Sequence, residues 1–317
     1  MILDKKYFGI DVGGTFIKGV IADGEGNVLS DSKIPTESRY GGERIISNIL
    51  HLCDSLLNEA GIKKGDVSAI GIGIPGIVDT RCGTVVFSAN LGLENFDIAS
   101  RVNKATSLPV KVANDANAAA LGEMKFGFKN RYKNIVFLTL GTGVGGGIII
   151  DGALYEGCGG AGAEIGHTVI DFLGEPCSCG RRGCIEAYSS ATALIRDTKR
   201  AMAAHRDSKL WEIATPDSVD GKTAFDCYER DPYAKEVIDN YISRLACAIT
   251  NMANLFRPEA VILGGGISAQ GDRLTKPLQK IVDREIFAKE NGPRVEILTA
   301  KLKNDAGALG AASLVIE

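Results

Sequence analysis

The chain has 317 residues, of which 45% are hydrophobic and 24% are charged, so it can bury a full core and is long enough for about two domains. Its formal net charge is −3, and Lys and Arg are interspersed with Asp and Glu, so we expect neither a nucleic-acid partner nor attraction to an anionic membrane. Because the sequence shows no signal peptide and no apolar run of about 20 residues, we expect a cytoplasmic protein that spans no membrane.

The first part of the chain predicts an α/β arrangement. Strands joined by glycine-containing turns are expected to form an antiparallel meander over 7–12, 15–22 and 27–34. Apolar residues then recur at helical spacing from Glu43 to Ala60, and Gly61 follows as a helix stop. Buried strands are expected at 67–78 and 108–114, and a helix is expected over 116–126.

The opening pattern returns at 135–157. A strand, a turn of Gly and Thr, a second strand, an Asp-Gly turn and a short strand follow one another there. We interpret this as a weak internal duplication that gives two domains of the same sheet type. The rest of the chain predicts helices at 186–204, 232–256, 271–287 and 304–316 and a strand at 261–266. The segment 205–225 has no assignable pattern.

Two glycine-rich turns are candidate phosphate sites. They lie at 11–15 (DVGGT) and 141–147 (GTGVGGG), and each carries a threonine. Backbone N–H groups in such turns can reach phosphate oxygens, although two flexible hairpins are the simpler alternative. The second turn matches a dinucleotide-binding pattern, but a strand follows it where that pattern requires a helix. Asp11 is a candidate Mg²⁺ ligand because carboxylate oxygens suit this ion.

Cysteines are unusually dense at 177–184. With His167 they supply the Cys₃His donor set that is typical of tetrahedral structural zinc: His167, Cys177, Cys179 and Cys184. A closed four-ligand site leaves no position for water, so the ion is expected to brace the loop rather than to catalyse. The alternative is a group of surface thiols kept reactive by Arg181 and Arg182.

A predicted strand gives way to a predicted helix at Asn114 and Asp115. Either residue can be a helix cap, and from the residues alone a cap is the simpler interpretation. A carboxylate at a helix N-terminus is stabilised in its ionised form by the helix dipole. Asp115 is therefore expected to be deprotonated at neutral pH and to be a weak base.

Taken together, the motifs resemble those of the ROK family (repressors, open reading frames, sugar kinases), within the actin-like and hexokinase-like ATPases. They are DVGGTFIK (11–18), GIGIPGIVD (71–79), NDANAAALGE (114–123), LGTGVGGG (140–147), EIGH (164–167), CSCGRRGCIEAY (177–188) and VILGGG (261–266). The resemblance spans essentially the whole chain. It implies two actin-like (ribonuclease H-like) α/β domains with a cleft between them: a small domain of 1–114 plus about 302–317, and a large domain of 115–301 that carries the zinc-binding loop.

The resemblance implies an ATP-dependent hexose kinase, with glucose to glucose 6-phosphate as the expected reaction and Asp115 as the general base. It implies ATP, Mg²⁺ and structural Zn²⁺ as cofactors and a homodimer as the assembly. The ATP and Mg²⁺ residues would be Asp11, Gly13, Gly14, Thr15, Lys18, Thr142, Gly143 and Gly265. The sugar residues would be Gly76, Asn90, Asn114, Asp115, Glu164, His167 and Glu186.

Other functions within this family remain open. N-acetylhexosamine (GlcNAc or ManNAc) and fructose kinases share nearly the same polar residues, although the apolar Ile77 favours an unmodified hexose. A repressor adds an N-terminal winged helix, and only six residues precede the first expected strand. A non-catalytic sugar-sensing protein is disfavoured by the presence of Asp11 and Asp115. Ala163 stands where many members have glycine, which predicts altered loop geometry before Glu164.

Overall fold

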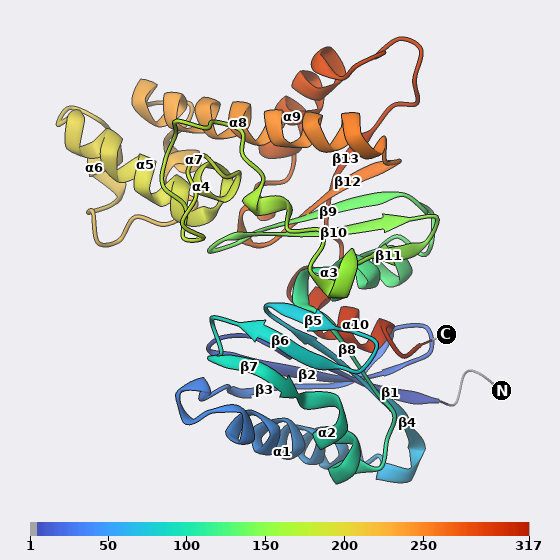
Figure 1. The fold of residues 1–317 in the computed structure, drawn as a ribbon. Helices are drawn as coiled ribbons and strands as arrows, with labels where there is room; N and C mark the ends of the chain where they lie inside the picture. Colours follow the sequence, from blue (N-terminus) through green and yellow to red (C-terminus); the bar gives the residue numbers. More distant parts are fainter. Residues whose placement is uncertain (1–4, 317) are drawn as a thin grey trace. The chain divides into compact units, whose positions relative to one another are not determined.

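The structure is a computed structural model and describes residues 5–316 (Figure 1). The chain folds into two compact units. The first unit comprises the chain up to Lys133, Gly147–Ala163 and the chain from Lys301, and the second comprises Asn134–Gly146 and Glu164–Ala300. The C-terminal segment thus lies with the N-terminal part of the chain.

A five-stranded sheet in the order β3-β2-β1-β4-β8 forms the centre of the first unit. Its strands are β1 (Lys6–Val12), β2 (Phe16–Asp23), β3 (Val28–Pro35), β4 (Val67–Ile74) and β8 (Val110–Asn114). The first three pair antiparallel, and β4 and β8 continue the sheet in parallel with β1. The predicted meander and both buried strands are confirmed. Because parallel strands end at the same edge of a sheet, Asp11 and Asn114 lie at one edge.

Helices cover both faces of this sheet (Figure 1). On one face lie α1 (Gly42–Ala60), which ends at Gly61 with φ 64° as predicted, and α2 (Ile98–Thr106). On the other face α3 (Asp115–Gly122) packs against α10 (Ala306–Ser313). The two helices meet at Gly122 and Gly310, where a Cβ on Gly122 would lie 2.6 Å from the Gly310 Cα. Only glycine allows this close approach.

A buried carboxylate joins the C-terminal segment to the end of α3. Glu123 begins a π-helical turn, η3 (Glu123–Gly127), and is fully buried. Its oxygens accept hydrogen bonds from the backbone nitrogens of Lys301 (2.9 Å) and Leu302 (2.8 Å). Because of this link and the contact with α10, residues 115–133 lie in the first unit, whereas the predicted boundary put them in the large domain.

The first unit also contains an antiparallel three-stranded sheet in the order β5-β6-β7. Its strands are β5 (Ile77–Asp79), β6 (Thr84–Ser88) and β7 (Leu93–Asp97). The second and third strands were not predicted. This sheet places Gly76 and Asn90 in the connections that precede β5 and follow β6.

The second five-stranded sheet has the order β11-β10-β9-β12-β13. Its strands are β9 (Ile135–Leu140), β10 (Val144–Ile150), β11 (Ala153–Tyr155), β12 (Ala260–Gly264) and β13 (Glu296–Thr299). In both large sheets the strands follow the order third, second, first, fourth, fifth, which is the order that the inferred duplication predicts. Gly147 approaches α3, where a Cβ would lie 2.6 Å from the Ala120 Cβ. Residues 147–163 therefore also lie in the first unit.

The second unit is rich in helices, in agreement with the predicted pattern. They are α4 (Glu186–Ser189), α5 (Ala191–Ala204), α6 (Leu210–Ile213), α7 (Thr223–Cys227), α8 (Pro232–Phe256) and α9 (Asp272–Glu285). The predicted helix over 186–204 is interrupted at Ser190, whose hydroxyl caps α5 by accepting from the Ala193 nitrogen at 3.1 Å. Shorter helical turns across the chain are η1 (Ser38–Tyr40), η2 (Lys64–Asp66), η4 (Cys158–Gly160), η5 (Ile165–His167), η6 (Gly266–Gln270) and η7 (Lys303–Asp305).

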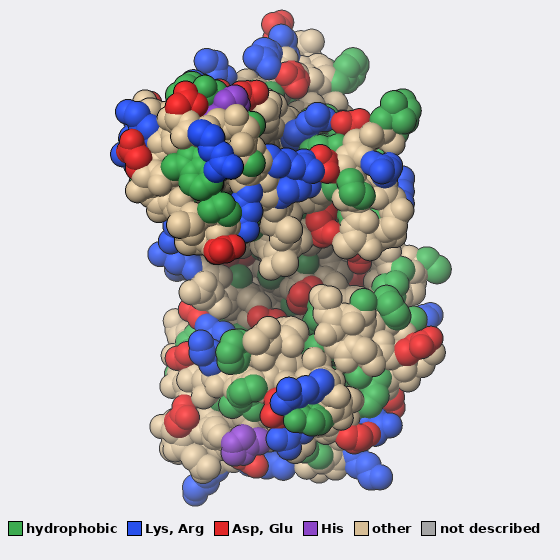
Figure 2. Space-filling model, turned by 90° about the vertical axis from the view of Figure 1, so that its left-hand side faces the viewer, with side chains coloured by type: hydrophobic (Ala, Val, Ile, Leu, Met, Phe, Trp, Pro, Cys, Tyr) green, Lys and Arg blue, Asp and Glu red, His purple; other side chains and the backbone are tan. Residues whose placement is uncertain are grey.

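Surface charge is mixed on the face drawn in Figure 2, where Lys and Arg side chains alternate with Asp and Glu. This agrees with the interspersed charges of the sequence. Within residues 5–316, no helix has both the length and the apolar character needed to cross a bilayer.

Candidate active site

The junction between β8 and α3 carries the predicted catalytic residue. Asn114 is the helix cap, since its Oδ1 accepts from the backbone nitrogens of Ala116 (2.9 Å) and Asn117 (3.2 Å). Its Nδ2 donates to the Gly76 carbonyl at 3.1 Å and so ties the junction to the loop before β5. Asp115 accepts from the Ala116 nitrogen at 2.8 Å. Because Asn114 already caps the helix, Asp115 is not needed for that role.

Burial changes the chemistry expected of Asp115. It raises the pKa of this carboxyl above its ordinary value, and the hydrogen bond from Ala116 lowers that pKa only in part. The expectation of a weak base was therefore wrong in direction, because the cost of burying a charge outweighs the helix dipole. A carboxylate with a raised pKa is a stronger proton acceptor, which suits a general base.

Asp11, near the end of β1, is electrostatically coupled to Asp115. Burial raises the pKa of Asp11 to about 6, the charge of Asp115 acts in the same direction, and Lys18 opposes them. Gly307 leaves room for this carboxylate, since a Cβ there would lie 2.2 Å from the Asp11 Oδ2. Two carboxylates at one sheet edge favour a divalent cation with oxygen ligands, so these residues fit Mg²⁺.

The first glycine turn is held by its own sheet. The Gly13 nitrogen donates to the Phe16 carbonyl at 2.9 Å, and the Thr36 hydroxyl donates to the Gly13 carbonyl at 2.6 Å. Gly14 and Thr15 are exposed at the tip. Lys18, a predicted phosphate contact, donates to Asp305 Oδ1 at 2.5 Å and to the Asn304 carbonyl at 3.1 Å. Since an ammonium has three donors, one remains for a phosphate.

The second glycine turn is held by α4 and α5. The Thr192 hydroxyl donates to the Thr142 carbonyl at 2.7 Å, and the Val144 nitrogen donates to Glu186 Oε2 at 3.1 Å. Glycine at 143 leaves room for this contact, because a Cβ there would lie 2.3 Å from that same oxygen and Glu186 would have to move. Glu186, a predicted sugar residue, therefore also anchors the second glycine turn.

Gly265 lies beside this turn. It follows β12 with φ 79°, and a Cβ there would lie 2.5 Å from the Leu140 carbonyl oxygen. A side chain at this position would thus push against the end of β9, which leads into the turn.

The predicted zinc ligands lie together. All four ligand atoms of His167, Cys177, Cys179 and Cys184 are within 4.8 Å of one another. The distance is 3.7 Å both from Cys179 Sγ to Cys184 Sγ and from Cys177 Sγ to His167 Nδ1. Two sulfurs bound tetrahedrally to one zinc ion at the usual bond length are separated by about 3.8 Å. The cluster therefore fits a zinc-sized metal ion.

Electrostatics also favours a cation in this cluster. Burial, and then the neighbouring thiols Cys179 and Cys177, raise the pKa of Cys184 to about 12. Three adjacent thiols cannot all ionise without a positive charge between them. Their loop reaches the phosphate turn through Glu186, whose Oε1 accepts from the Ser178 hydroxyl at 2.9 Å and lies 3.6 Å from Cys177 Sγ.

The segment before Glu164 has strained backbone. Ala163 has φ 63°, in the left-handed region that favours glycine. Glu164 precedes η5, and its carbonyl accepts from the His167 nitrogen at 3.1 Å. Ala163 thus adopts the backbone conformation that a glycine favours, and whether the loop geometry differs from that of members with glycine stays a prediction.

Gly76 and Asn90 lie on the small sheet. Gly76 has φ 112°, and a Cβ there would lie 2.1 Å from the Phe87 carbonyl oxygen, so the position requires glycine. Asn90 is exposed in the turn between β6 and β7.

The candidate residues are divided between the two units. The first carries Asp11, Gly13, Gly14, Thr15, Lys18, Gly76, Asn90, Asn114 and Asp115, and the second carries Thr142, Gly143, Glu164, His167, Cys177, Cys179, Cys184, Glu186 and Gly265. The sequence did not identify Thr36, Ser178 or Thr192 as supports of the turns. Single hydroxyl residues outside a motif give no signal in one sequence.

The ROK family model matches residues 7–317. The chain belongs to the ROK family. A glucokinase from Halalkalibacterium halodurans is 38% identical to this ROK chain, over 98% of this chain and 95% of the relative. A glucokinase from Thermotoga maritima is 37% identical, over 98% of each chain.

Among solved structures, a ROK family glucokinase from Streptomyces griseus, in complex with glucose and AMPPNP, superimposes with a TM-score of 0.83. It is 35% identical, and the match covers 98% of each chain. The predicted family and the actin-like α/β fold class are therefore confirmed.

Proposed function

We propose that this ROK protein is an ATP-dependent hexose kinase and that it phosphorylates glucose to glucose 6-phosphate. The observation that carries the proposal is Asp115, a half-buried carboxylate with a raised pKa that is coupled to Asp11 and is not needed as a helix cap, because Asn114 has that role. The similarity to two glucokinases over nearly the whole chain supports glucose as the sugar.

In the proposed reaction, the Asp115 carboxylate accepts the proton of the sugar 6-hydroxyl. That oxygen bonds to the γ-phosphorus of ATP, the bond from this phosphorus to the bridging oxygen breaks, and ADP leaves with the electron pair. Phosphoryl transfer passes through a loose transition state, so positioning and charge neutralisation contribute most of the catalysis. Magnesium, when bound, supplies positive charge beside the phosphates, and Asp11 is the residue that would hold it.

The glycine turns are the proposed nucleotide contacts. Gly14 and Thr15 are exposed at the tip of the first turn and Gly13 forms its base, and Thr142 and Gly143 form the second turn. Lys18 has one remaining donor, and Gly265 keeps the space beside Leu140 open. Backbone N–H groups arranged in this way bind phosphate oxygens without side-chain interference.

The proposed sugar contacts are Gly76, Asn90, Asn114, Asp115, Glu164, His167 and Glu186. His167 presents Nδ1 to Cys177, which leaves Nε2 for a sugar hydroxyl. The carboxylates accept hydrogen bonds from sugar hydroxyls, whereas Nε2, which carries the proton when Nδ1 is a metal ligand, donates one to a sugar oxygen.

Structural zinc on His167, Cys177, Cys179 and Cys184 is part of the proposal. The ion would hold the loop that presents Ser178 to Glu186, and Glu186 in turn fixes the phosphate turn at Val144. All eight cysteines are free thiols, which suits a reducing cytoplasm. We also propose that the protein is a homodimer, on the basis of the family resemblance.

A coupled assay of ADP release tests the proposal. The purified, metal-loaded protein is assayed with ATP and each of glucose, mannose, fructose, GlcNAc and ManNAc, and the product is identified by NMR. We expect the highest kcat/KM with glucose and phosphorylation at its 6-hydroxyl. No sugar-dependent ADP release from folded protein would contradict the kinase proposal, and a higher kcat/KM for an N-acetylhexosamine would contradict glucose.

A further inference from the structure

The first unit contains a cavity that none of the predicted site residues lines. Its volume is about 640 Å³, and its lining residues all belong to this one unit. They come from β1, β4, β8, β11, the end of α3, η3 and the residues that end α10. Cavities of this size hold small organic ligands.

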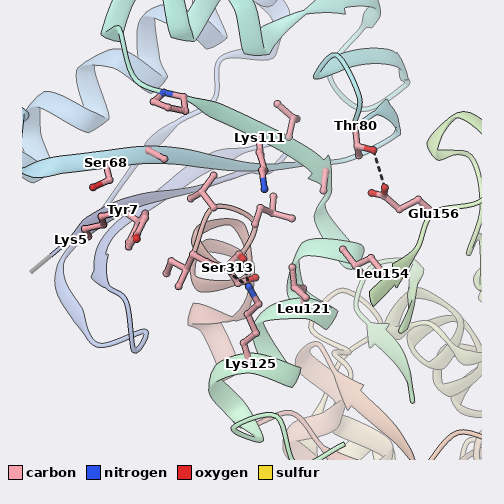
Figure 3. A pocket seen from close by; sticks show the side chains of 17 residues that line it. Lys5, Tyr7, Ser68, Thr80, Lys111, Leu121, Lys125, Leu154, Glu156 and Ser313 are labelled. Atoms are coloured by element: carbon pink, nitrogen blue, oxygen red, sulfur yellow. Dashed lines mark hydrogen bonds between the residues drawn. The ribbon is translucent and has the colours of Figure 1, made fainter. Parts of the chain in front are cut away.

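Three lysines line this cavity: Lys5, Lys111 and Lys125. Lys111 reaches in from β8 and Lys125 from η3, and their side chains point toward each other (Figure 3). Lys125 Nζ donates to the carbonyls of Ser313 (2.9 Å) and Ile316 (2.6 Å), which leaves one donor of three. Within residues 5–316, no carboxylate forms an ion pair with either lysine.

The remaining lining adds an apolar floor. Tyr7, Ala69 and Ile316 belong to a buried hydrophobic cluster beneath the lysines. Glu156 is the one acidic residue among the described lining residues, and its Oε2 accepts from the Thr80 hydroxyl at 2.8 Å (Figure 3). The cavity therefore combines an apolar surface with three lysines, two of which point toward each other, and one carboxylate that is already hydrogen-bonded.

Structural roles explain only part of this arrangement. Lys125 supports the end of α10, since cations stabilise helix C-termini. A lysine on an edge strand such as β8 also discourages pairing with other strands. Neither role requires Lys111 to face Lys125. Burial and then the charge of Lys111 lower the pKa of Lys125, and an anion bound between the two lysines would relieve their repulsion.

We propose that this cavity binds a small phosphate monoester, with its phosphate between Lys111 and Lys125 and its organic group against Tyr7 and Ala69. The site goes beyond the proposed kinase function. Lys111 lies on the strand that ends at Asn114, and Lys125 lies on the turn that continues α3. The ligand therefore touches both elements that hold Asp115, and we propose that it changes kcat. This second part rests on the proposed kinase function, whereas binding itself does not.

Isothermal titration calorimetry with glycerol 3-phosphate and with inorganic phosphate tests the site. The variants are Lys111→Gln and, as a control with the same charge change, Lys104→Gln, an exposed lysine of α2 outside the cavity. Lys111→Gln should weaken binding about tenfold, the loss expected of one charge-assisted hydrogen bond. Lys104→Gln should leave the Kd unchanged. The ester should bind more tightly than inorganic phosphate because of the apolar floor.

A second variant and a rate measurement complete the test. Lys125→Gln should weaken binding to a similar degree and also lower Tm, because it loses contacts with α10; Lys111→Gln, on an exposed position, should keep the wild-type Tm. Glycerol 3-phosphate should change kcat in the wild type and not in Lys111→Gln.

The binding proposal is overturned if millimolar ester gives no heat, if Lys111→Gln binds as the wild type does, or if inorganic phosphate binds as tightly as the ester. Binding without an effect on kcat would overturn the coupling alone.

Discussion

The two glycine turns follow the same strand plan but are stabilised in different ways. The first turn is held within its own unit by the Thr36 hydroxyl on the Gly13 carbonyl. The second is held by the Glu186 carboxylate on the Val144 nitrogen, and Glu186 is in turn bonded to Ser178 in the Cys and His loop. The first turn therefore depends on its sheet, and the second depends on a loop that fits a metal ion.

The two units also differ in which property a substitution is expected to change. The first unit carries Asp11 and Asp115, whose pKa values are both raised. The second carries the second glycine turn, which Glu186 joins to the loop of the Cys₃His cluster. Changes to the carboxylates should therefore alter kcat, and changes to the cluster should alter stability and the KM for ATP.

The largest effect is expected for Asp115→Asn. Loss of the general base should lower kcat about 100- to 10,000-fold, while the sugar affinity stays close to that of the wild type. Steady-state kinetics and sugar titration measure the two quantities. Asp66→Asn, on the exposed turn η2, is the matched control and should keep wild-type kcat. Near-normal turnover of Asp115→Asn would contradict the assignment.

Removal of one cluster thiol should have the next largest effect. Cys179 is exposed, so Cys179→Ala removes a ligand with little loss of packing. We expect loss of bound metal, a decrease of at least about 2 kcal/mol in the free energy of unfolding, and a larger rise in the KM for ATP than fall in kcat.

Metal analysis, thermal unfolding and kinetics measure these three quantities. Cys247→Ala, also at an exposed cysteine, should change none of them. The metal-bracing account fails if Cys179→Ala loses its metal but keeps wild-type Tm and KM.

Asp11→Asn should separate stability from activity. Asp11 has a pKa of about 6 in the folded protein, above its value in the unfolded chain. Between about pH 4 and pH 6 the folded state therefore still holds a proton that the unfolded state has released. The free energy of unfolding decreases as the pH rises through this range. Without Mg²⁺ at pH 7.5, the variant should be more stable than the wild type by about 1–3 kcal/mol, and turnover should be nearly abolished.

Urea unfolding at several pH values measures this difference. The stability gained by Asp11→Asn should shrink as the pH falls through about 6 and approach zero near pH 3, where wild-type Asp11 is protonated in both states. In the wild type, turnover should decrease as the pH falls through about 6. A constant difference from pH 4 to 7.5 would show that the carboxylate charge is not its source.

The smallest effect is expected at Ala163. Its φ of 63° is strained for alanine, so Ala163→Gly should stabilise the native backbone by about 1 kcal/mol. Glycine also gives the unfolded chain more conformational entropy, and this effect offsets part of the gain. Thermal unfolding should show an equal or slightly higher Tm. The same substitution at the end of α1, Ala60→Gly, is the control and should lower Tm because that position is helical. A clear decrease in the Tm of Ala163→Gly would contradict strain at this loop.

Much of the fold could be predicted because periodic patterns are local. The two meanders, α1 and α8 follow from runs of apolar residues with clear turn signals. The elements β6, β7, β13 and α2 were missed because they are short or have weak periodicity, and the break at Ser190 depends on a cap within a continuous helical pattern.

The sequence predicted which residues belong to the candidate site better than it predicted their contacts and pKa values. Motifs identified Asp115 and the four cluster ligands, but the upward shift of the Asp115 pKa depends on burial by distant segments. The contact of Glu186 with Val144 joins residues 42 positions apart and follows only from the fold.

The central claim is that Asp115 receives the proton of the hydroxyl that attacks ATP. A crystal structure with glucose and AMPPNP tests it most directly. We predict that an Asp115 oxygen lies about 2.6–3.2 Å from the sugar 6-hydroxyl oxygen and that this hydroxyl faces the γ-phosphorus. A closed complex in which another carboxylate, or none, contacts that hydroxyl would contradict the claim.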